Sequence, residues 1–182
     1  AALVTTDTLV VAATATVTSS DAMSVAEANA VDAKTSGVIT ATLDTGDTAS
    51  YSTLTGTGNA YTVTVNDAGS TAITATALST LGGKTTGTVT VSNAIAISGT
   101  QAEVTAALVT TDTLVVAGSA TATISDANTT AIDATALSAI GGKTSGAVTV
   151  TNAIAISGTQ AEITAALVTT DTLVVAGTAT AT

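Results

Sequence analysis

Cysteine, histidine, proline, phenylalanine and tryptophan are all absent from this 182-residue chain, and tyrosine occurs only twice. Without histidine or cysteine, the chain lacks the side chains that most often serve as general base or nucleophile near neutral pH. With almost no aromatic residues, it also lacks the usual lining of a deep ligand pocket. We therefore expect a protein that is not an enzyme.

Positive charge is scarce as well. Three lysines stand against thirteen acidic residues, which gives a net charge of −10. This balance disfavours binding to nucleic acid and to anionic membrane surfaces, because both partners carry negative charge. No run approaches the 18 or so apolar residues of a membrane span, and the first residues lack the basic and apolar regions of a signal peptide. We expect neither a nucleic-acid partner nor membrane insertion.

Threonine and alanine dominate what is present: 45 threonines and 39 alanines make up almost half of the chain. Such small side chains cannot fill a wide interior, but they can fill a thin one in which two layers of backbone lie close together. A hydrophobic content of 46% argues against disorder, since it is chains of low hydrophobicity that stay unfolded. The composition predicts a folded, thin and elongated molecule.

The chain copies itself. Residues 82–123 recur as residues 141–182, with five of the 42 positions changed, and the period is 59 residues. Residues 1–12 are identical to residues 106–117 and 165–176. Such faithful copies are typical of repeat proteins, in which each unit stacks on the next and buries a core that no unit could bury alone. We expect residues 1–182 to be one segment of a longer array, with the two copies displaced along a common axis by two strand spacings, about 10 Å.

Each period divides into two related halves of roughly 30 residues. We predict that each half forms one coil, that is, one turn of a solenoid. One half carries a lysine and occurs at 20–37, 66–87 and 125–146; the other occurs at 98–118 and 157–177. Lys34 and Lys84 are 50 positions apart, whereas Lys84 and Lys143 are 59 apart. The early coil, which includes residues 43–65 and both tyrosines, is therefore shorter by about ten residues.

Capping chemistry predicts short helices. Three pairs have the spacing of a capping box, in which each side chain accepts a hydrogen bond from a backbone amide of the first turn: Ser24 with Glu27, Thr100 with Glu103, and Thr159 with Glu162. In the lysine half, an apolar stripe predicts a further helix that ends at Gly141 or Gly142. Its residues are Ile132, Ala136, Leu137 and Ile140.

Between these helices, residue types alternate with the period of two that is typical of strands, at 61–65, 89–91, 94–97 and 120–124. The alternation of helix and strand predicts an α/β fold: a right-handed solenoid of about six coils, each a short helix plus one or two short parallel strands, with Asx residues at the corners. A pure β-solenoid is the alternative, because threonine and isoleucine favour strands.

Two glycine-lysine motifs, at 82–86 and 141–145, resemble the end of a phosphate-binding loop. That loop needs a further glycine five positions earlier, where this chain has Leu78 and Leu137. We instead predict a helix end followed by a solvated lysine.

Aspartates suggest one candidate metal site. Carboxylate and carbonyl oxygens are the ligands that Ca²⁺ takes. The candidates are Asp44 and Asp47 in the run DTGDT and the recurring Asp21, Asp67 and Asp126 at corners. The competing hypothesis is that these residues cap helices or close Asx turns. The same two readings apply to Asp7, Asp112 and Asp171.

Alternating threonines, as in residues 61–65 and 178–182, could form a flat face that orders water or engages a glycan. Threonine is also simply favoured at outward strand positions. Both interpretations stay open.

In the runs SGTQAEVTAAL (98–108), VTVSNA (89–94), TATISDA (121–127) and TALSAIGGKTSG (135–146), the chain resembles the Ala/Thr/Asp-rich tandem repeats of giant secreted bacterial surface proteins. These include repeat-in-toxin-associated adhesins and cyanobacterial cell-surface proteins, although this chain has no GGxGxD nonapeptide. The resemblance implies a structural segment of an extracellular or cell-surface protein: a stalk, a filament, or surface-layer or matrix material. Because the first and last residues of the chain lie within the repeat rather than in a polar cap, we also expect continuation into further repeats or end-to-end self-association. The alternative is a binding module with a threonine-rich face for ice or glycan.

Overall fold

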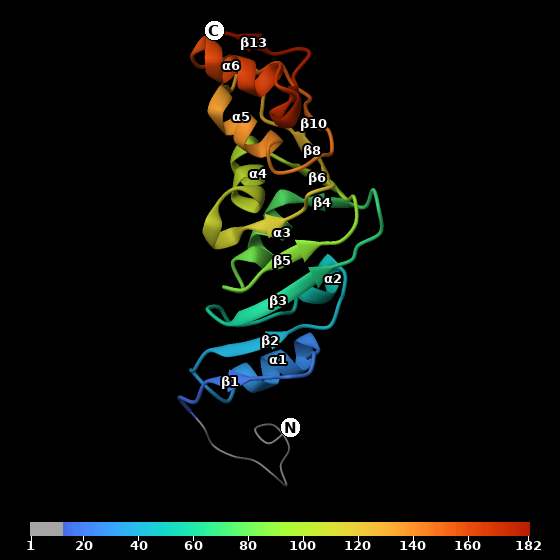
Figure 1. Ribbon diagram of the computed structural model, residues 1–182, viewed down its shortest axis with the longest axis vertical. Coiled ribbons are helices and arrows are strands. Elements are labelled where there is room, and N and C mark those ends of the chain that lie inside the picture. The colour runs from blue at the N-terminus through green and yellow to red at the C-terminus, as the bar shows by residue number, and fades with distance from the viewer. Residues whose placement is uncertain (1–12) are drawn as a thin grey trace.

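The computed structural model describes residues 13–182, which form an α/β protein with six α-helices and parallel β-sheets. The molecule is elongated, and β1 (Val17–Thr18) and β13 (Thr180–Ala181) lie at opposite ends of its long axis (Figure 1). Residues 1–12, which include Asp7 and the first copy of the segment 106–117, lie outside the described residues.

The strands of the described residues form three sheets. The first has the order β1, β2 (Ile39–Thr42), β3 (Ala60–Val65), β5 (Val89–Val91) and β7 (Val115–Val116). The second has the order β12 (Val174–Val175), β10 (Val148–Val150), β8 (Thr121–Ile124), β6 (Ala96–Gly99) and β4 (Ala72–Thr74). The third has the order β13, β11 (Ala155–Ser157) and β9 (Ala131–Asp133). Every pairing is parallel, as the sequence predicted.

The helices are short, and most have eight residues. They are α1 (Val25–Asp32), α2 (Thr48–Tyr51), α3 (Ala75–Gly82), α4 (Gln101–Leu108), α5 (Ala134–Gly141) and α6 (Gln160–Leu167). Two 3-10 turns, η2 (Thr111–Thr113) and η3 (Thr170–Thr172), follow α4 and α6. The exception is α2, with four residues, and it lies in the early coil that the lysine spacing marked as shortened.

All three predicted capping boxes are confirmed, because Ser24, Thr100 and Thr159 are the N-caps of α1, α4 and α6. In the last of these, the amide of Thr159 donates to Glu162 at 2.7 Å, and the amide of Glu162 donates back to the Thr159 hydroxyl at 3.4 Å. The helices exclude the pure β-solenoid. Their first-turn amides are satisfied locally by these caps, so threonine-rich segments need not extend.

One helix prediction was wrong in its start. Ile132 is buried but lies in β9, and α5 begins at Ala134. The side chains that α5 buries are those of Ala134, Leu137 and Ile140, while Ala136 is half-buried. A strand that runs directly into a helix keeps an apolar residue inward on both sides of the junction, so the stripe looked continuous.

The two sequence copies contain the same elements in the same order, but they do not lie in one ladder. Two steps of the first sheet lead from Val63 through Val89 to Val115, an advance of 52 residues. The corresponding path in the second sheet, from Ile97 to Val148, advances 51 residues, whereas the sequence repeats after 59. Each period thus carries seven or eight residues more than two ladder steps.

These surplus residues fall between α4 and α5, whose first residues are 33 positions apart, whereas those of α3 and α4 are 26 apart. In that interval β7, β8 and β9 follow one another. β7 ends the first sheet, and β8 pairs with β6 on one edge and with β10 on the other. The helices lie behind the strands in the lower half of Figure 1 and reach the left edge of the molecule with α4, α5 and α6. The sheets and the helices that pack on them therefore change direction around the long axis from one end of the described residues to the other.

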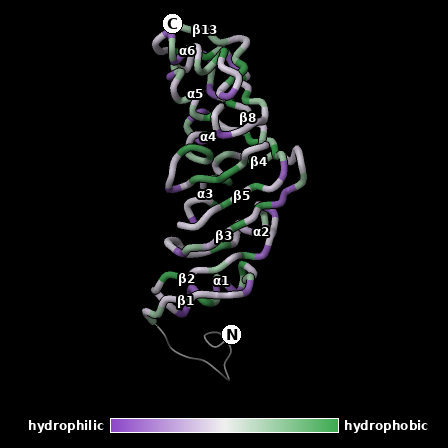
Figure 2. Tube along the Cα trace, in the orientation of Figure 1, coloured by the Kyte–Doolittle hydropathy of each residue, from purple (hydrophilic) through white to green (hydrophobic). Residues whose placement is uncertain are grey.

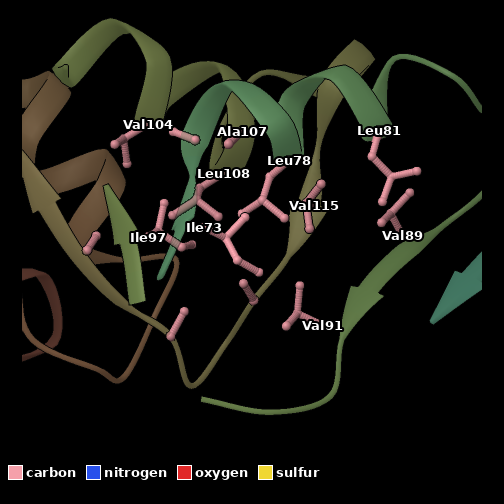
Figure 3. Packing of buried hydrophobic residues seen from close by; sticks show 14 of the residues in the cluster. Ile73, Leu78, Leu81, Val89, Val91, Ile97, Val104, Ala107, Leu108 and Val115 are labelled. Carbon is pink, nitrogen blue, oxygen red and sulfur yellow. The ribbon is translucent and has the colours of Figure 1, made fainter. Parts of the chain in front are cut away.

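A single apolar cluster runs through the described residues and consists of alanine, valine, isoleucine and leucine with Tyr51 and Tyr61. Helix residues such as Leu78 and Leu108 point toward strand residues such as Val115 (Figure 3). Apolar and polar residues alternate along the strands, and polar residues gather at the turns (Figure 2). The expectation that threonine fills this interior was wrong: among the described threonines, only Thr35 and Thr85 are buried.

Candidate functional site

The threonine that follows each lysine forms hydrogen bonds with the main chain of the preceding coil. The Thr85 hydroxyl is buried between two carbonyl oxygens to which it can donate. That of Tyr61 lies 2.8 Å away and that of Asn59 lies 3.0 Å away. The same hydroxyl accepts hydrogen bonds from the amides of Tyr61 at 2.7 Å and Gly87 at 2.9 Å. One hydroxyl thus satisfies main-chain groups of two successive coils, which explains why a threonine is buried here.

The same corner recurs twice. The Thr35 hydroxyl donates to the Ala15 carbonyl at 2.6 Å, and the Thr144 hydroxyl donates to the Ala120 carbonyl. The glycine two positions later is required by close packing, because a Cβ atom on Gly146 would overlap the Ala120 carbonyl group. The glycine-lysine motifs are therefore packing corners, and the predicted helix ends are confirmed at Gly82 and Gly141.

A cleft lies beside each of these corners, with volumes of about 460 Å³ at Thr85, about 430 Å³ at Thr144 and about 430 Å³ at Thr35. Their walls consist mostly of glycine, threonine and serine. The corner hydroxyls on those walls are committed to the main chain, as Thr86 is to Asn59 and Ser145 is to Gly118. Neither tyrosine lines these three clefts, so they offer a sugar ring no aromatic stacking surface.

Two of the five candidate aspartates connect successive coils. The Asp67 carboxylate accepts from the amide and the hydroxyl of Thr48, at 2.7 and 2.6 Å. The Asp126 carboxylate accepts from the amide of Gln101 at 2.6 Å. Thr48 and Gln101 are the first residues of α2 and α4, so each aspartate caps the helix of the preceding coil.

The other three aspartates have different roles. Asp47 is the N-cap of α2 and accepts from the amide and hydroxyl of Ser50, which hold the pKa of Asp47 below its ordinary value. The Asp44 carbonyl accepts from the Tyr51 hydroxyl at 2.7 Å, and the Asp21 carbonyl accepts from Ser19 at 2.8 Å. Within residues 13–182, no three acidic side chains come together as a metal site would require. Ca²⁺ binding stays a prediction, and a rise in melting temperature on adding Ca²⁺ would support it.

Asparagines complete the corners, as the sequence predicted for Asx residues. Asn93 and Asn152 donate to the carbonyls of Asp67 and Asp126, at 2.8 and 2.7 Å. Buried Asn59 accepts from the amide of Ile39 at 2.9 Å. Corner asparagines therefore join coils that are neighbours in space and 20 to 26 residues apart in sequence.

Threonines also cover the outward side of the first sheet. Strand register places threonine beside threonine in three cross-strand pairs: Thr18 with Thr40, Thr42 with Thr62, and Thr64 with Thr90. All six are exposed or half-buried, and none of their hydroxyls bonds to another residue of the described chain. We call these six residues the threonine face. Its hydroxyls are available to water or a ligand, in contrast to the corner threonines.

The tyrosines differ from each other. The Tyr51 hydroxyl donates to the carbonyls of Asp44 and Thr64, at 2.7 and 2.9 Å. The Tyr61 hydroxyl is buried and has no partner among the described residues, and burial raises the Tyr61 pKa to about 12. Both hydroxyls are therefore protonated at neutral pH.

No protein family model, curated protein or solved structure matches this chain. None of the helices within residues 13–182 has the length and apolar character needed to cross a bilayer.

Proposed function

We propose that the chain is a structural repeat segment of an extracellular bacterial surface protein, in which it forms a stalk, a filament, or surface-layer or matrix material. The proposal rests on one observation above all. The most elaborate polar contacts of the molecule, those of Thr85, Asp67 and Asp126, join one coil to the next. Threonine and aspartate side chains, which can build a ligand site in other proteins, here connect successive coils along the long axis.

The proposed architecture is a right-handed solenoid. Parallel strands with a helix between them favour this description, because nearly all such crossovers are right-handed. Each step between paired strands takes 20 to 26 residues, too few for a separate domain and enough for one turn of chain around a thin core. Coils of this kind can repeat without limit, which suits a long stalk or a filament.

A non-catalytic role agrees with the composition. Histidine is the side chain that most often serves in general acid or base catalysis, and the chain has neither histidine nor cysteine. A net charge of −10 keeps the long side walls mutually repulsive, so contact between copies is favoured at the ends rather than along the sides.

Immunogold electron microscopy of the producing bacterium tests this function. We expect label outside the cell envelope, in fibres or a surface layer. Label confined to the cytoplasm would contradict the proposal.

The threonine face favours a second candidate, a binding module for ice or glycan. Its cross-strand neighbours are about 4.8 Å apart and its neighbours along a strand are about 6.6 Å apart, so the face is a regular grid of hydroxyl and methyl groups. A grid of this kind suits a ligand that is itself regular.

Thr62→Lys tests this candidate, because it places a long charged side chain in the middle of the threonine face. Inhibition of ice recrystallisation and binding to polysaccharide should be lost in this variant and kept in Thr135→Lys, which alters an exposed threonine of α5. If the unmodified chain shows neither property, the candidate is wrong.

A further inference from the structure

Helix α2 lacks the last turn that its counterpart α4 has. The two helices align through their caps, because Asp67 accepts from the first amide of α2 and Asp126 accepts from the first amide of α4. In this alignment Tyr51 of α2 corresponds to Val104 of α4, and both side chains are buried. α2 ends at Tyr51, whereas α4 continues to Leu108. The early coil therefore leaves out one turn of helix.

A cleft of about 350 Å³ lies between α2 and α3, beside the point where α2 ends. Tyr51 and Leu81, which are 3% and 5% exposed, give the cleft an apolar lining together with half-buried Ala77. Thr80 of α3 is exposed at this cleft, whereas its copy Ala139 in α5 is half-buried. Small-molecule sites begin at about 300 Å³, so the cleft is large enough for a small ligand.

Lys84 is the one charged residue among those that line this cleft. Its main-chain amide donates to the Leu81 carbonyl at 3.0 Å, while its ammonium group has no hydrogen-bond or ion-pair partner within residues 13–182. Lys84 is half-buried, whereas its copy Lys143 is exposed. The cleft thus combines apolar side chains with an unpaired cation, in a chain whose net charge is −10.

Two hydroxyls of the cleft can still donate a hydrogen bond. The Thr80 hydroxyl makes no bond to another residue of the described chain, and the Thr74 hydroxyl only accepts, from the Ala77 amide at 3.2 Å. The hydroxyls of Thr48 and Thr76 already donate to carboxylates of the protein. The polar groups that the cleft offers to a ligand are therefore donors, which suit a negatively charged acceptor.

The corner clefts differ in charge from this one. Each has an aspartate in its wall, which is Asp32, Asp112 or Asp171. Lys143 lines the corner cleft that contains Asp171. A carboxylate in the wall repels an anionic ligand, so the equivalent lysine of the second period does not provide an equivalent site.

We propose that the cleft between α2 and α3 binds a small monocarboxylate with an apolar body. The carboxylate of the ligand pairs with the Lys84 ammonium group and accepts from the Thr80 hydroxyl, while the apolar body packs on Leu81, Ala77 and the edge of Tyr51. The ligand carries a single charge, because the cleft holds a single cation and the chain as a whole repels polyanions. This binding goes beyond the structural function and does not depend on it.

Both parts of the ligand are needed. An ion pair that is open to solvent contributes little by itself, because water and salt screen it. A small apolar group by itself gains little from a half-open cleft, since binding must first offset the loss of translational and rotational freedom. A ligand that has both parts should bind with a dissociation constant of about 1 mM.

Benzoate is the probe for this site, with heteronuclear NMR spectroscopy of the full chain as the measurement. Its addition should shift the amide signals of Ala77, Leu81 and Lys84 with one common dissociation constant. Benzyl alcohol has the same ring without the charge, so it should bind at least about fivefold more weakly.

Lys84→Gln and Lys143→Gln form a matched pair, because the two lysines occupy equivalent positions in the repeat. Lys84→Gln should weaken benzoate binding by about fivefold or more, and Lys143→Gln should leave it unchanged. Neither lysine side chain bonds to another residue within residues 13–182, so both variants should keep the fold. Circular dichroism checks this.

The site is assigned wrongly if benzoate causes no saturable shifts in α3, if benzyl alcohol binds as tightly as benzoate, or if the two glutamine variants bind benzoate equally well. None of these results bears on the structural function, which immunogold microscopy tests separately.

Discussion

Threonine side chains fall into two groups in this molecule. Those at the corners, such as Thr85, are buried and bonded to the main chain of the preceding coil, while those of the threonine face, such as Thr62, are exposed and make no such bond. The two groups differ in energetic weight, since a buried polar group that loses its partners costs far more than an exposed one. Threonine content by itself therefore says little about stability.

Thr85→Val should lower the free energy of unfolding by about 2–3 kcal/mol, because it keeps the shape of the side chain and leaves the amides of Tyr61 and Gly87 without an acceptor. Thr88→Val, at an exposed position, should change it by no more than about 0.5 kcal/mol. Urea denaturation of the two variants measures the difference. Equal effects would mean that the corner hydroxyl has no special role.

Thr129 has a φ of 66°, a left-handed conformation that β-branched residues rarely adopt, and its copy Ser70 has a φ of 65°. Thr129→Asn should stabilise the chain by about 1 kcal/mol, because asparagine tolerates this conformation. Thr129→Val keeps the branching and should give no gain. Thermal denaturation separates the two variants, and a gain from valine would show that strain is not the cause.

At the scale of elements, α1, α2, α3, α4 and α6 are capped by the side chain of their own N-cap residue, whereas the N-cap of α5, Asp133, makes no side-chain capping bond. The corners are held by hydrogen bonds to a neighbouring coil. The caps decide where helices begin in a chain rich in threonine. The corners decide how closely successive coils approach, and there a single methyl group is too large.

The capping boxes make stability depend on pH. Bonds from the backbone and side chain of Thr100, and from Thr76, lower the pKa of Glu103 below its ordinary value of 4.5. Because the folded protein then binds fewer protons than the unfolded one, this stabilisation is complete above pH 4.5 and is lost as the pH falls through the folded pKa. Glu27 and Glu162 behave alike. We expect the melting temperature to fall below pH 4.5.

Glu103→Gln provides the control, because glutamine can complete the box without titrating. This variant should lose less of its melting temperature between pH 5 and pH 3 than the unmodified chain does. Identical pH profiles would contradict the assignment.

Gly146→Ala should destabilise the chain by about 3 kcal/mol, since the added Cβ overlaps the Ala120 carbonyl group and forces two coils apart. Gly118 and Gly177 have no atom within 4 Å of an added Cβ. Gly118→Ala should therefore be neutral or slightly stabilising. Chemical denaturation compares the pair, and similar losses for both would contradict the packing explanation.

At the scale of the whole molecule, stability should vary along the axis. Each coil contacts only its neighbours, so coils with neighbours on both sides are the last to open. Hydrogen exchange should be slowest for amides of β5 and β8, such as that of Ala122, and faster for those of β1 and β13. Uniform protection from end to end would mean that the chain opens only as one unit.

The sequence predicted the features that depend on local chemistry. Capping boxes, short strands, parallel pairing and asparagine at corners all follow from residues a few positions apart or from the repeat itself. The start of α5 was missed because Ile132 continues the apolar stripe across a strand-to-helix junction. The contact between Thr85 and Tyr61 joins residues 24 positions apart, and only the register between strands brings them together.

Of the candidate site, the sequence identified the aspartates but not their partners. Asp67 and Asp126 cap helices that precede them by 19 and 25 residues, a relation that no local motif expresses. The seven or eight surplus residues per period were also invisible, since the sequence repeat and the ladder repeat coincide in many proteins and differ here.

That surplus limits how far any one face can extend. The first ladder ends at β7, the second begins at β4 and the third begins at β9, so within residues 13–182 no single ladder runs the length of the molecule. In a longer array, the exposed threonines would therefore follow a helical path around the long axis. Such an object meets its surroundings from every side in turn, so it could be embedded in a matrix but could not lie flat along an extended crystal.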